Sequence, residues 1–282
     1  MSGDRLRAAG FTLLELIVSM AVALVLVLAV ATLHARILYM SADTARAADA
    51  QDTVRIGLAI LEHELRHAGF WGLVPEAARI AGRQGDAEPL DVSVAGDCGP
   101  GWALDLDRFI EAWAGGWPLD CTPFGGVPPA GALLVLRRAD TRLASPEPGV
   151  LQVQSDPWSG RLDVVGGTPD AGADVRDLVA RAYYVSPRST GDPTRPSLRR
   201  KTLQRGPRVV DEEVVPGIAD LVVELGVDTD VVDAPGYGQV NRFVPPGDAV
   251  GRIRAIRVTL RADDPAQLSA TRTIVLHNGD GS

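Results

Sequence analysis

The sequence opens with an apolar run that is interrupted by a charge at one position only. The 23 residues from Phe11 to Leu33 contain a single charged side chain, that of Glu15. As a helix rising about 1.5 Å per residue, this run would be about 34 Å long, enough to cross the ~30 Å hydrocarbon core of a bilayer. A carboxylate inside such a helix costs roughly 2.5–3.5 kcal/mol, so it needs a partner or a function. The run therefore predicts a membrane-spanning helix with one functional acid.

A secretory signal peptide or a plain membrane anchor is the first alternative for this run. It is longer than the roughly 7–15 apolar residues of a signal peptide, and no small-residue cleavage site follows it cleanly. A short polar leader with Arg5 and Arg7 precedes the run and ends in Gly10. These features favour a different kind of leader.

The segment Gly10-Phe-Thr-Leu-Leu-Glu15 resembles the class III leader of type IV pilins and type II secretion pseudopilins. In that family a membrane peptidase cuts between the residues that match Gly10 and Phe11, and the new amino terminus is methylated. The glutamate that matches Glu15 pairs with the terminal amine of a neighbouring subunit during filament assembly. A buried carboxylate is tolerable when a cation meets it at low dielectric. The resemblance thus implies a removable leader over residues 1–10, N-methylation of Phe11 and an assembly role for Glu15.

Helical periodicity continues beyond the apolar run. Apolar residues at steps of four and three form one stripe, which consists of Val54, Leu58, Leu61, Leu65 and Ala68. Proline is absent up to Pro75, and Gly69 is a natural stop signal for a helix. We predict one spine helix over residues 11–69, with residues 11–33 in the membrane or the filament core.

Charge and cysteine content narrow the function and the compartment. The net charge is −8 and no basic cluster stands out, which argues against direct binding of nucleic acid. Cys98 and Cys121 are the two cysteines, and both would lie outside the cytoplasmic membrane. An oxidising compartment favours a disulfide between them, with two buried free thiols as the alternative. Closing this loop would contribute roughly 3–3.5 kcal/mol.

Beyond the spine, two regions differ in composition. Residues 70–130 are rich in glycine and proline and predict an irregular subdomain pinned by the disulfide, with a short helix over residues 105–113. Residues 131–282 alternate apolar and polar side chains, which predicts a mainly antiparallel β-sheet domain because no helical spacers separate the strands. The polar stretch 186–207 is expected to be a loop or mobile hairpin. The predicted strands cover residues 132–138, 149–154, 161–165, 178–185, 208–214, 221–225, 253–261 and 271–277.

Later segments sharpen the family resemblance. Three segments are similar to parts of PilW-type minor pilins. Residues 65–72 are similar to the end of the spine helix, and residues 215–230 to a strand that leads into an Asp-rich turn. Residues 252–261 are similar to the strand that follows this turn. The resemblance implies an α+β, type IV pilin-like fold with a long N-terminal helix packed on an antiparallel sheet. It implies a structural subunit of the minor-pilin complex that primes pilus assembly and sits at the filament tip. A J-type pseudopilin of type II secretion is the nearest alternative, and the length of the chain favours the pilus.

The resemblance also implies partners and a location. The partners would be other minor pilins, the major pilin, the prepilin peptidase, the pilus assembly platform and a tip adhesin. The chain would span the inner membrane once, with a periplasmic C-terminal domain, and would belong to the pilus (fimbrium) after assembly. We expect no enzyme activity and no cofactor. Motility, cell adhesion and DNA uptake are alternative functions of such a filament.

One motif indicates a competing class of function. His63-Glu64-Leu65-Arg66-His67 reads H-E-x-x-H, in which two histidines one helical turn apart bind zinc and the glutamate acts as general base. A catalytic zinc needs a third protein ligand, and no Gly-x-x-His follows. A membrane-tethered zinc metallopeptidase is therefore the less favoured alternative. The other interpretation is a charged helix end, where the helix dipole favours His63 and His67.

A second motif could attract a cation. Asp228, Asp230 and Asp233 form D-x-D-x-x-D in a predicted loop, and calcium prefers such oxygen ligands. The glycine and the terminal glutamate of an EF-hand are missing. An ordinary turn, in which the Asp side chains accept hydrogen bonds from backbone N–H groups, is the favoured interpretation. We therefore predict no metal site, with His63, His67 and these three aspartates as weak candidates.

Overall fold

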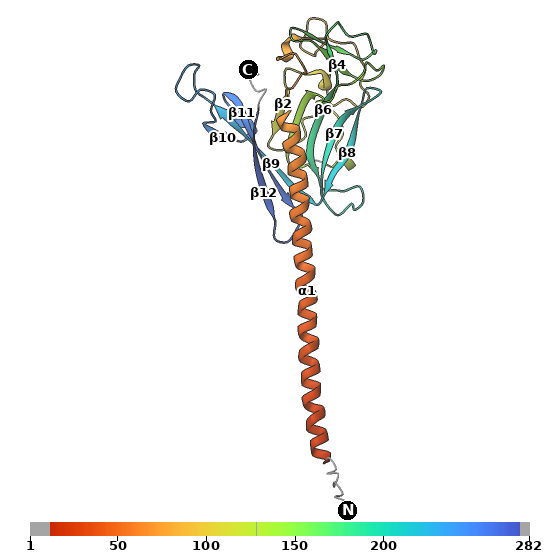
Figure 1. Ribbon diagram of the computed structural model, residues 1–282, viewed down its shortest axis with the longest axis vertical. Coiled ribbons are helices and arrows are strands. Elements are labelled where there is room, and N and C mark those ends of the chain that lie inside the picture. Colours follow the sequence, from red (N-terminus) through yellow and green to blue (C-terminus); the bar gives the residue numbers. More distant parts are fainter. Residues whose placement is uncertain (1–11, 128, 277–282) are drawn as a thin grey trace, which may run out of the picture. The chain divides into compact units, whose positions relative to one another are not determined.

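The computed structural model describes residues 12–127 and 129–276, apart from the side chains of residues 38, 39, 41, 42 and 130. The predicted leader, its Gly10 and the adjoining Phe11 lie outside the described residues, as does the end of the strand predicted over residues 271–277. The chain divides into two compact units, one up to Ala48 and one from Asp49 onward. Figure 1 shows the elements of both units.

Helix α1 spans Leu13–Arg66 and is the one element that belongs to both units. Every described side chain from Leu13 to Ala48 is exposed. A helix whose first half is apolar all round and exposed all round has no core of its own to fill. Its natural surroundings are lipid or other apolar helices.

The second half of α1 carries one buried face. Ala50, Val54, Leu58, Leu61 and Leu65 are buried in the main core of the second unit. Burying each large aliphatic side chain of this face contributes roughly 1.5–3 kcal/mol. The predicted apolar stripe is therefore the face that joins the helix to its sheets.

The end of α1 is set by a glycine. The helix ends at Arg66, three residues before the predicted boundary, and Gly69 then takes a left-handed conformation with φ of +73°. The Gly69 N–H donates to the carbonyl of Arg137 at 3.0 Å, which ties the chain to the sheet. A Cβ at this position would lie 2.9 Å from the ring of Phe109. A left-handed backbone and a close approach both require glycine here.

An eight-stranded sheet forms the larger layer of the second unit. Its order is β1-β5-β4-β6-β3-β2, with β7 beside β6 and β8 beside β7. All of its strand pairs are antiparallel except β1 with β5. The strands are β1 Ile80–Ala81, β2 Ile110–Trp113, β3 Ala130–Ala139, β4 Gln152–Ser155, β5 Gly160–Asp163, β6 Asp174–Ser186, β7 Ser197–Gln204 and β8 Arg208–Pro216.

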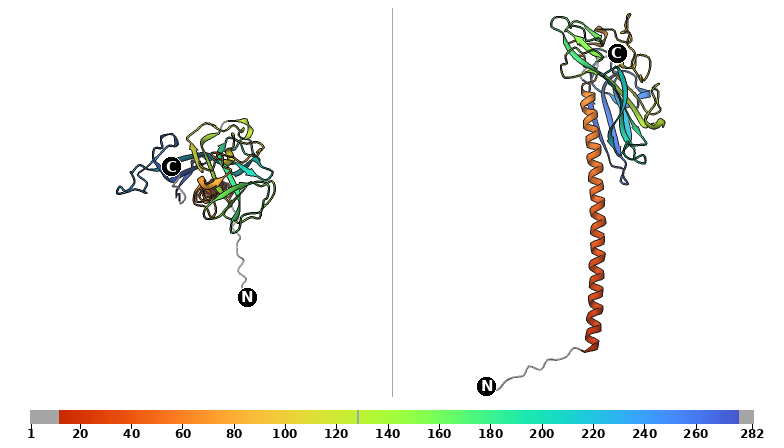
Figure 2. Two further views of the ribbon diagram at one scale, coloured as in Figure 1. Left: turned by 90° about the horizontal axis from the view of Figure 1, so that it is seen from above. Right: turned by 90° about the vertical axis from the view of Figure 1, so that its right-hand side faces the viewer.

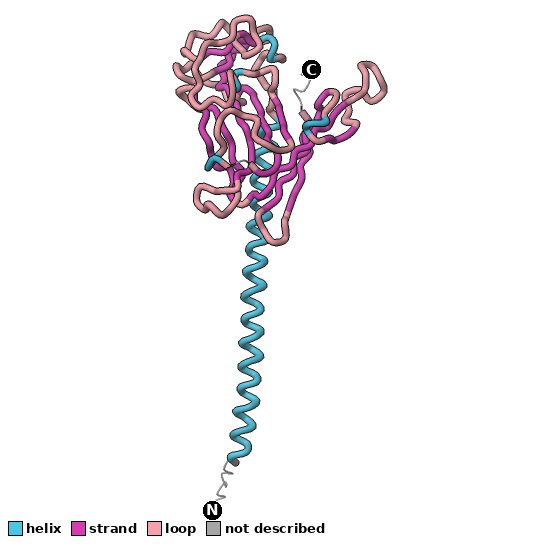
Figure 3. The backbone as a smooth tube through the Cα atoms, turned by 180° about the vertical axis from the view of Figure 1, so that it is seen from behind, coloured by secondary structure: helices cyan, strands magenta, loops and turns pink. Residues whose placement is uncertain are grey.

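A four-stranded antiparallel sheet forms the other layer, in the order β10-β9-β11-β12. Its strands are β9 Ile218–Asp228, β10 Arg242–Val244, β11 Arg252–Ala262 and β12 Ser269–Val275. Four short 3-10 turns complete the elements, at Ala77–Arg79, Trp102–Leu104, Phe124–Gly126 and Pro246–Asp248. Figures 2 and 3 show the strands of the second unit from other directions, with loops gathered at one end of the larger sheet. The predicted α+β architecture, a long N-terminal helix with a mainly antiparallel β domain, is confirmed.

Alternation along the strands explains how the core forms. In β11, Ile256, Val258 and Leu260 are buried, whereas Arg261 on the other face is exposed. The buried side chains join those of α1 and of the larger sheet in one apolar cluster. Because side chains alternate across a strand, the same strand has one buried face and one solvent-exposed face.

The prediction of a loop or mobile hairpin over residues 186–207 is wrong for the second half of the segment, where β7 is a strand of the sheet between β6 and β8. The three basic residues Arg199, Arg200 and Lys201 made this segment look solvated. In the structure they lie opposite Glu213, Glu212 and Asp211 of β8, each as a cross-strand pair. Ion pairs of 2.7–3.1 Å neutralise the basic side chains. Opposite charges across a ladder are favourable, so the strand tolerates them.

The prediction of a helix over residues 105–113 is also wrong. The segment ends in strand β2, which pairs antiparallel with β3 from Ile110 to Trp113. Glu111 on β2 forms an ion pair of 2.8 Å with Arg137 of β3, whose side chain is only 1% exposed. A buried guanidinium needs such a partner, and β pairing brings the carboxylate to it. Burial lowers the pKa of Arg137, and Glu111 opposes that shift.

Candidate functional site

Thr12, which directly precedes α1, and Glu15 in its first turn form a capping arrangement. The Thr12 N–H donates to the Glu15 carboxylate at 3.0 Å, and the Thr12 hydroxyl donates to the same oxygen, Oε2, at 2.9 Å. In return the Glu15 N–H donates to the Thr12 hydroxyl at 3.3 Å. This is a capping box, in which Thr12 precedes the helix and Glu15 is its third residue. Glu15 is therefore held at the helix start by neutral donors of its own chain.

The sequence carries the signal for this arrangement, the spacing Thr-x-x-Glu. Sequence reasoning assigned Glu15 to assembly and missed its reciprocal bonds with Thr12. An acid at a helix start also faces the positive end of the helix dipole. Both effects orient the carboxylate without neutralising it, so a cation can still add to its stability in a low-dielectric surrounding.

The apolar segment follows directly. Leu13–Ile37 is the one helical segment among the described residues that is long and apolar enough to cross a membrane. At about 1.5 Å per residue its 25 residues extend over roughly 37 Å. The first charged side chains of α1 after this segment, Asp43 and Arg46, pair with each other at 3.3 Å.

Comparison with known families identifies the motif. Residues 5–31 match the family described as the prokaryotic N-terminal methylation motif. The match covers residues 5–10 of the predicted leader, the capping box and most of the apolar run. Neither the comparison with curated proteins nor that with solved structures gave a match.

The matched motif and the apolar helix together support a class III-signal pilin or pseudopilin in general. They are consistent with a membrane-anchored, structural protein that interacts with other components of a pilus-type assembly. The motif accounts for the N-terminal segment and leaves the large second unit to be explained by its own residues.

The H-E-x-x-H segment forms a buried ion cluster. Glu64 is 4% exposed, and its carboxylate lies 3.3 Å from the guanidinium of Arg138 and in direct contact with that of Arg181. His63 is exposed, and Nδ1 of His67 lies 2.8 Å from the His63 carbonyl oxygen. Glu64 thus points into the domain, bound by two arginines. The geometry gives no support to the metallopeptidase alternative, and the described residues hold no group of three or more His, Cys, Asp or Glu able to bind a metal.

The aspartates of the β9–β10 loop organise that loop. Asp228 is 2% exposed and accepts hydrogen bonds from the N–H of Gly238 at 2.7 Å and of Asp230 at 3.0 Å. These donors lower the pKa of Asp228, with Gly238 as the largest cause. Asp230 in turn accepts from Asn241 at 3.1 Å. Asp233 is exposed with φ of +70°. Asp228 and Asp230 accept hydrogen bonds within the turn, as the favoured interpretation expected, whereas Asp233 is exposed, and the three side chains do not form a group that could hold a metal.

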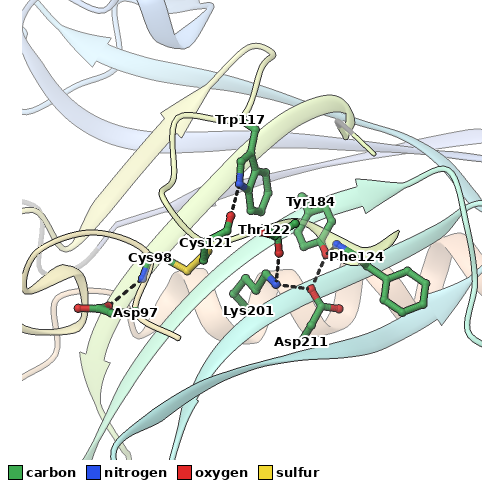
Figure 4. Close-up of a disulfide and its surroundings, with 9 residues drawn as sticks. All are labelled: Asp97, Cys98, Trp117, Cys121, Thr122, Phe124, Tyr184, Lys201 and Asp211. Atoms are coloured by element: carbon green, nitrogen blue, oxygen red, sulfur yellow. Dashed lines mark hydrogen bonds and ion pairs between the residues drawn. A yellow bond between two sulfur atoms is a disulfide. The ribbon is translucent and has the colours of Figure 1, made fainter. Parts of the chain in front are cut away.

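Cys98 and Cys121 form a disulfide (Figure 4). The segment that ends at Cys121 is fastened to the larger sheet by further bonds. The Trp117 indole donates to the Cys121 carbonyl at 2.5 Å, and the Trp117 ring meets the Tyr184 ring edge-on at 4.9 Å. Lys201 donates to the carbonyl of Thr122 at 2.6 Å. The disulfide therefore closes residues 98–121 into a loop. We call this loop, together with the adjoining residues 122–124, the strap; it lies over one face of the sheet.

A buried polar group lies under this strap. The Tyr184 hydroxyl donates to the carboxylate of Asp211, which also forms an ion pair of 3.1 Å with Lys201. Burial raises the pKa of Tyr184, and Asp211 raises it further, so that the hydroxyl stays protonated and donates. The Phe124 N–H donates to the Tyr184 oxygen at 2.9 Å. The strap and the β7–β8 hairpin thus share one hydrogen-bond network, as Figure 4 shows.

Removing the disulfide should destabilise the second unit without unfolding the first. We expect the double variant Cys98→Ser with Cys121→Ser to lose about 3 kcal/mol of unfolding free energy, because the loop of the unfolded chain is no longer closed. Urea denaturation of the full chain in detergent, followed by tryptophan fluorescence, measures this loss. All five tryptophans lie in the second unit. A reducing agent should lower the stability of the unsubstituted chain and leave the double variant unchanged; an equal effect on both would contradict the assignment.

Proposed function

We propose that the chain is a minor pilin of the type IV pilus, a structural subunit of the complex that primes pilus assembly and sits at the filament tip. The methylation motif over residues 5–31 and the exposed apolar helix support a subunit that is cut, released into a helical bundle and held there. The residues that carry this proposal are Gly10 and Phe11 at the cleavage site and Glu15 in the helix.

The single observation that carries the proposal is the placement of Glu15. It is the one charge between Phe11 and Leu33, and Thr12 holds it at the start of the helix. Two unit charges attract far more strongly at low dielectric than in water. The methylated amine of an adjacent subunit, once the leader is removed, supplies the missing positive charge. Such a pair would set the register of one helix against the next.

The proposal implies a location and a set of partners. The chain would span the inner membrane once through Leu13–Ile37, with the second unit on the periplasmic side, and would enter the pilus after cleavage. The prepilin peptidase would process it, and the assembly platform would bring it together with other minor pilins, the major pilin and a tip adhesin. A J-type pseudopilin of type II secretion would use the same N-terminal motif. Recovery in sheared pili rather than with the secretion apparatus separates the two functions.

The test is incorporation of a Glu15→Ala variant. We expect its amount in the filament fraction to fall at least about ten-fold, equivalent to a lost interaction of 1.4 kcal/mol, with the membrane level and the mature mass unchanged. Ser19→Ala is the matched control, because Ser19 is a polar side chain of the same helix that bonds only its own backbone, at Leu16. Incorporation of Glu15→Ala at the level of the control would sink the proposed mechanism.

A further inference from the structure

Strand β12 presents an open hydrogen-bonding edge. It is the last strand of the smaller sheet and pairs only with β11. The Leu276 N–H donates to the carbonyl of Arg254, and the Ala262 N–H donates to that of Leu268. Since antiparallel ladders alternate, the even-numbered residues of β12 bond β11 and the odd-numbered ones point outward. Among the described residues, no backbone partner is found for these outward groups, which belong to Ser269, Thr271, Thr273 and Val275.

Other edges of the second unit are short or protected. Strands β1, β10 and β2 have two, three and four residues. Strand β8 carries the successive acids Asp211, Glu212 and Glu213, and Ala95 pairs with it at Arg208. Charge and short length are the usual means by which proteins keep an edge from pairing with another chain. Strand β12 has seven residues and Arg272 as its one charged side chain. It lacks the protection that the other edges have.

One face of β12 packs against the core and the other face is exposed, as is needed for another strand to be added beside it. Ile274 is buried, and Ala270 packs partly buried against the same core cluster. On the opposite face Thr271 and Thr273 are exposed, and Val275 is 61% exposed. A strand placed beside β12 would therefore extend the main core on one face and a polar surface on the other. Backbone bonds supply the affinity in such an addition, and alternate side chains supply the specificity.

The charge on β12 argues against pairing with a second copy of this chain. In a full-length antiparallel pair of two β12 strands, Arg272 lies at the centre and meets Arg272 of the other copy directly. Like charges directly opposite each other are destabilising. The Arg272 side chain is 56% exposed, and the nearest acid is Glu62 at 3.8 Å. This edge instead suits a partner strand that brings a carboxylate.

We propose that the free edge of β12 binds an extended strand of a different pilin-type subunit, one with an acidic residue near Arg272 and small apolar residues beside Ala270 and Ile274. The inference rests on the proposed function, because an assembly of pilin-type subunits is what brings such a strand alongside. In this contact, two strands of neighbouring globular domains pair through backbone hydrogen bonds. It adds to the contacts that the N-terminal helices make.

A proline at an outward position tests the edge without breaking the sheet. Thr271→Pro removes an N–H that points away from β11, a position where strands tolerate proline. Thr271→Val is the matched control: it loses the same hydroxyl, which lies 2.8 Å from that of Thr259, and keeps the N–H. A photo-crosslinking amino acid at Thr273, introduced into the full chain in its native membrane, reports the neighbour. Mass spectrometry of the linked peptide then identifies the chain and the strand.

The expected result is an adduct with an extended segment of another chain that bears a prepilin-type N-terminus. Thr271→Pro should reduce that adduct about ten-fold, and Thr271→Val should leave it unchanged. An adduct with a second copy of this chain, an adduct with a protein of another class, no adduct, or equal yields for both variants would each overturn the inference. Should the proline variant fail to fold, as judged by its urea midpoint, the identity of the adduct in the unsubstituted background decides.

Filament incorporation, measured in the same cells, separates this inference from the proposed function. Normal incorporation with no β12 adduct defeats the edge contact and leaves the minor-pilin proposal standing. Absence of the unsubstituted protein from every filament fraction defeats the minor-pilin proposal itself.

Discussion

Glu64→Ala should lower the unfolding free energy of the second unit by about 3–5 kcal/mol, a large share of the stability of a typical domain. The substitution leaves Arg138 and Arg181 without the carboxylate between them. Arg138 is 3% exposed, so water cannot replace the lost partner. Removing one member of a buried ion cluster costs more than the pair contributed, because the remaining charge stays buried. Urea denaturation followed by tryptophan fluorescence measures the loss.

The matched control for this prediction is Glu62→Ala, two residues earlier on α1. Glu62 pairs with Arg66 at 2.5 Å, but its side chain is 29% exposed and that of Arg66 is 57% exposed. Partly hydrated ion pairs of this kind contribute about 0–1 kcal/mol. The two variants remove the same side chain from the same helix, so their difference reports burial alone. Equal losses would mean that the Glu64 cluster is hydrated in solution, contrary to the structure.

Gly10→Val should leave the leader attached to the chain. In the class of leader that this segment resembles, cleavage follows the residue matching Gly10, and only then is an amine available to pair with Glu15. We expect the mass of the membrane-bound protein to exceed that of the unsubstituted one by the mass of residues 1–10, with little change from the added side chain itself. Incorporation into filaments should fall to background for the same reason. Intact-mass measurement on purified protein checks both the cut and its position.

Ala8→Val serves as the control for cleavage, since it adds the same bulk two residues before the cut. We expect normal processing of this variant. A Gly10→Val protein with an unchanged mature mass would refute the assignment of the cleavage site. Processing lost in both variants would show that the leader is read as a whole, and Gly10 would then have no special role.

The long helix is the part of the fold that sequence predicts best. Apolar content predicts a membrane-type segment over residues 11–33, and the structure has an exposed apolar helical segment at Leu13–Ile37. The stripe through Val54 and Leu61 predicts the buried face of the helix. Both are local properties of one helix, so no tertiary information is needed. The strands with strict alternation, such as β9 and β11, are predicted for the same reason, although their ends extend beyond the predicted ranges.

Strand β7 shows where local reading fails. Arg199, Arg200 and Lys201 look like a solvated loop until the acids of β8 are placed opposite them. The run Asp211-Glu212-Glu213 begins ten residues after Lys201. Two neighbouring runs of opposite charge at this spacing indicate a β-hairpin in which they pair. The missing information is the pairing of two segments. A prediction made one segment at a time cannot supply it.

The candidate sites also divide into those made by neighbouring residues, which the sequence predicts, and those made by distant residues, which it does not. A motif such as H-E-x-x-H names residue types, but the partner of Glu64 comes from strands β3 and β6, at Arg138 and Arg181, far along the chain. No spacing in the sequence links these three positions. The Thr12–Glu15 capping box, by contrast, is local and could have been predicted from its spacing.

The placement of Lys201 has a practical consequence for labelling. It is the only lysine in the sequence, it is 8% exposed, and its amine is held by Asp211 and the Thr122 carbonyl. The native domain therefore offers amine-reactive dyes no accessible ε-amino group. A succinimidyl ester applied to the folded protein reports almost solely on the α-amino end of the chain, which turns ordinary conjugation chemistry into a reporter of how that end is modified or covered.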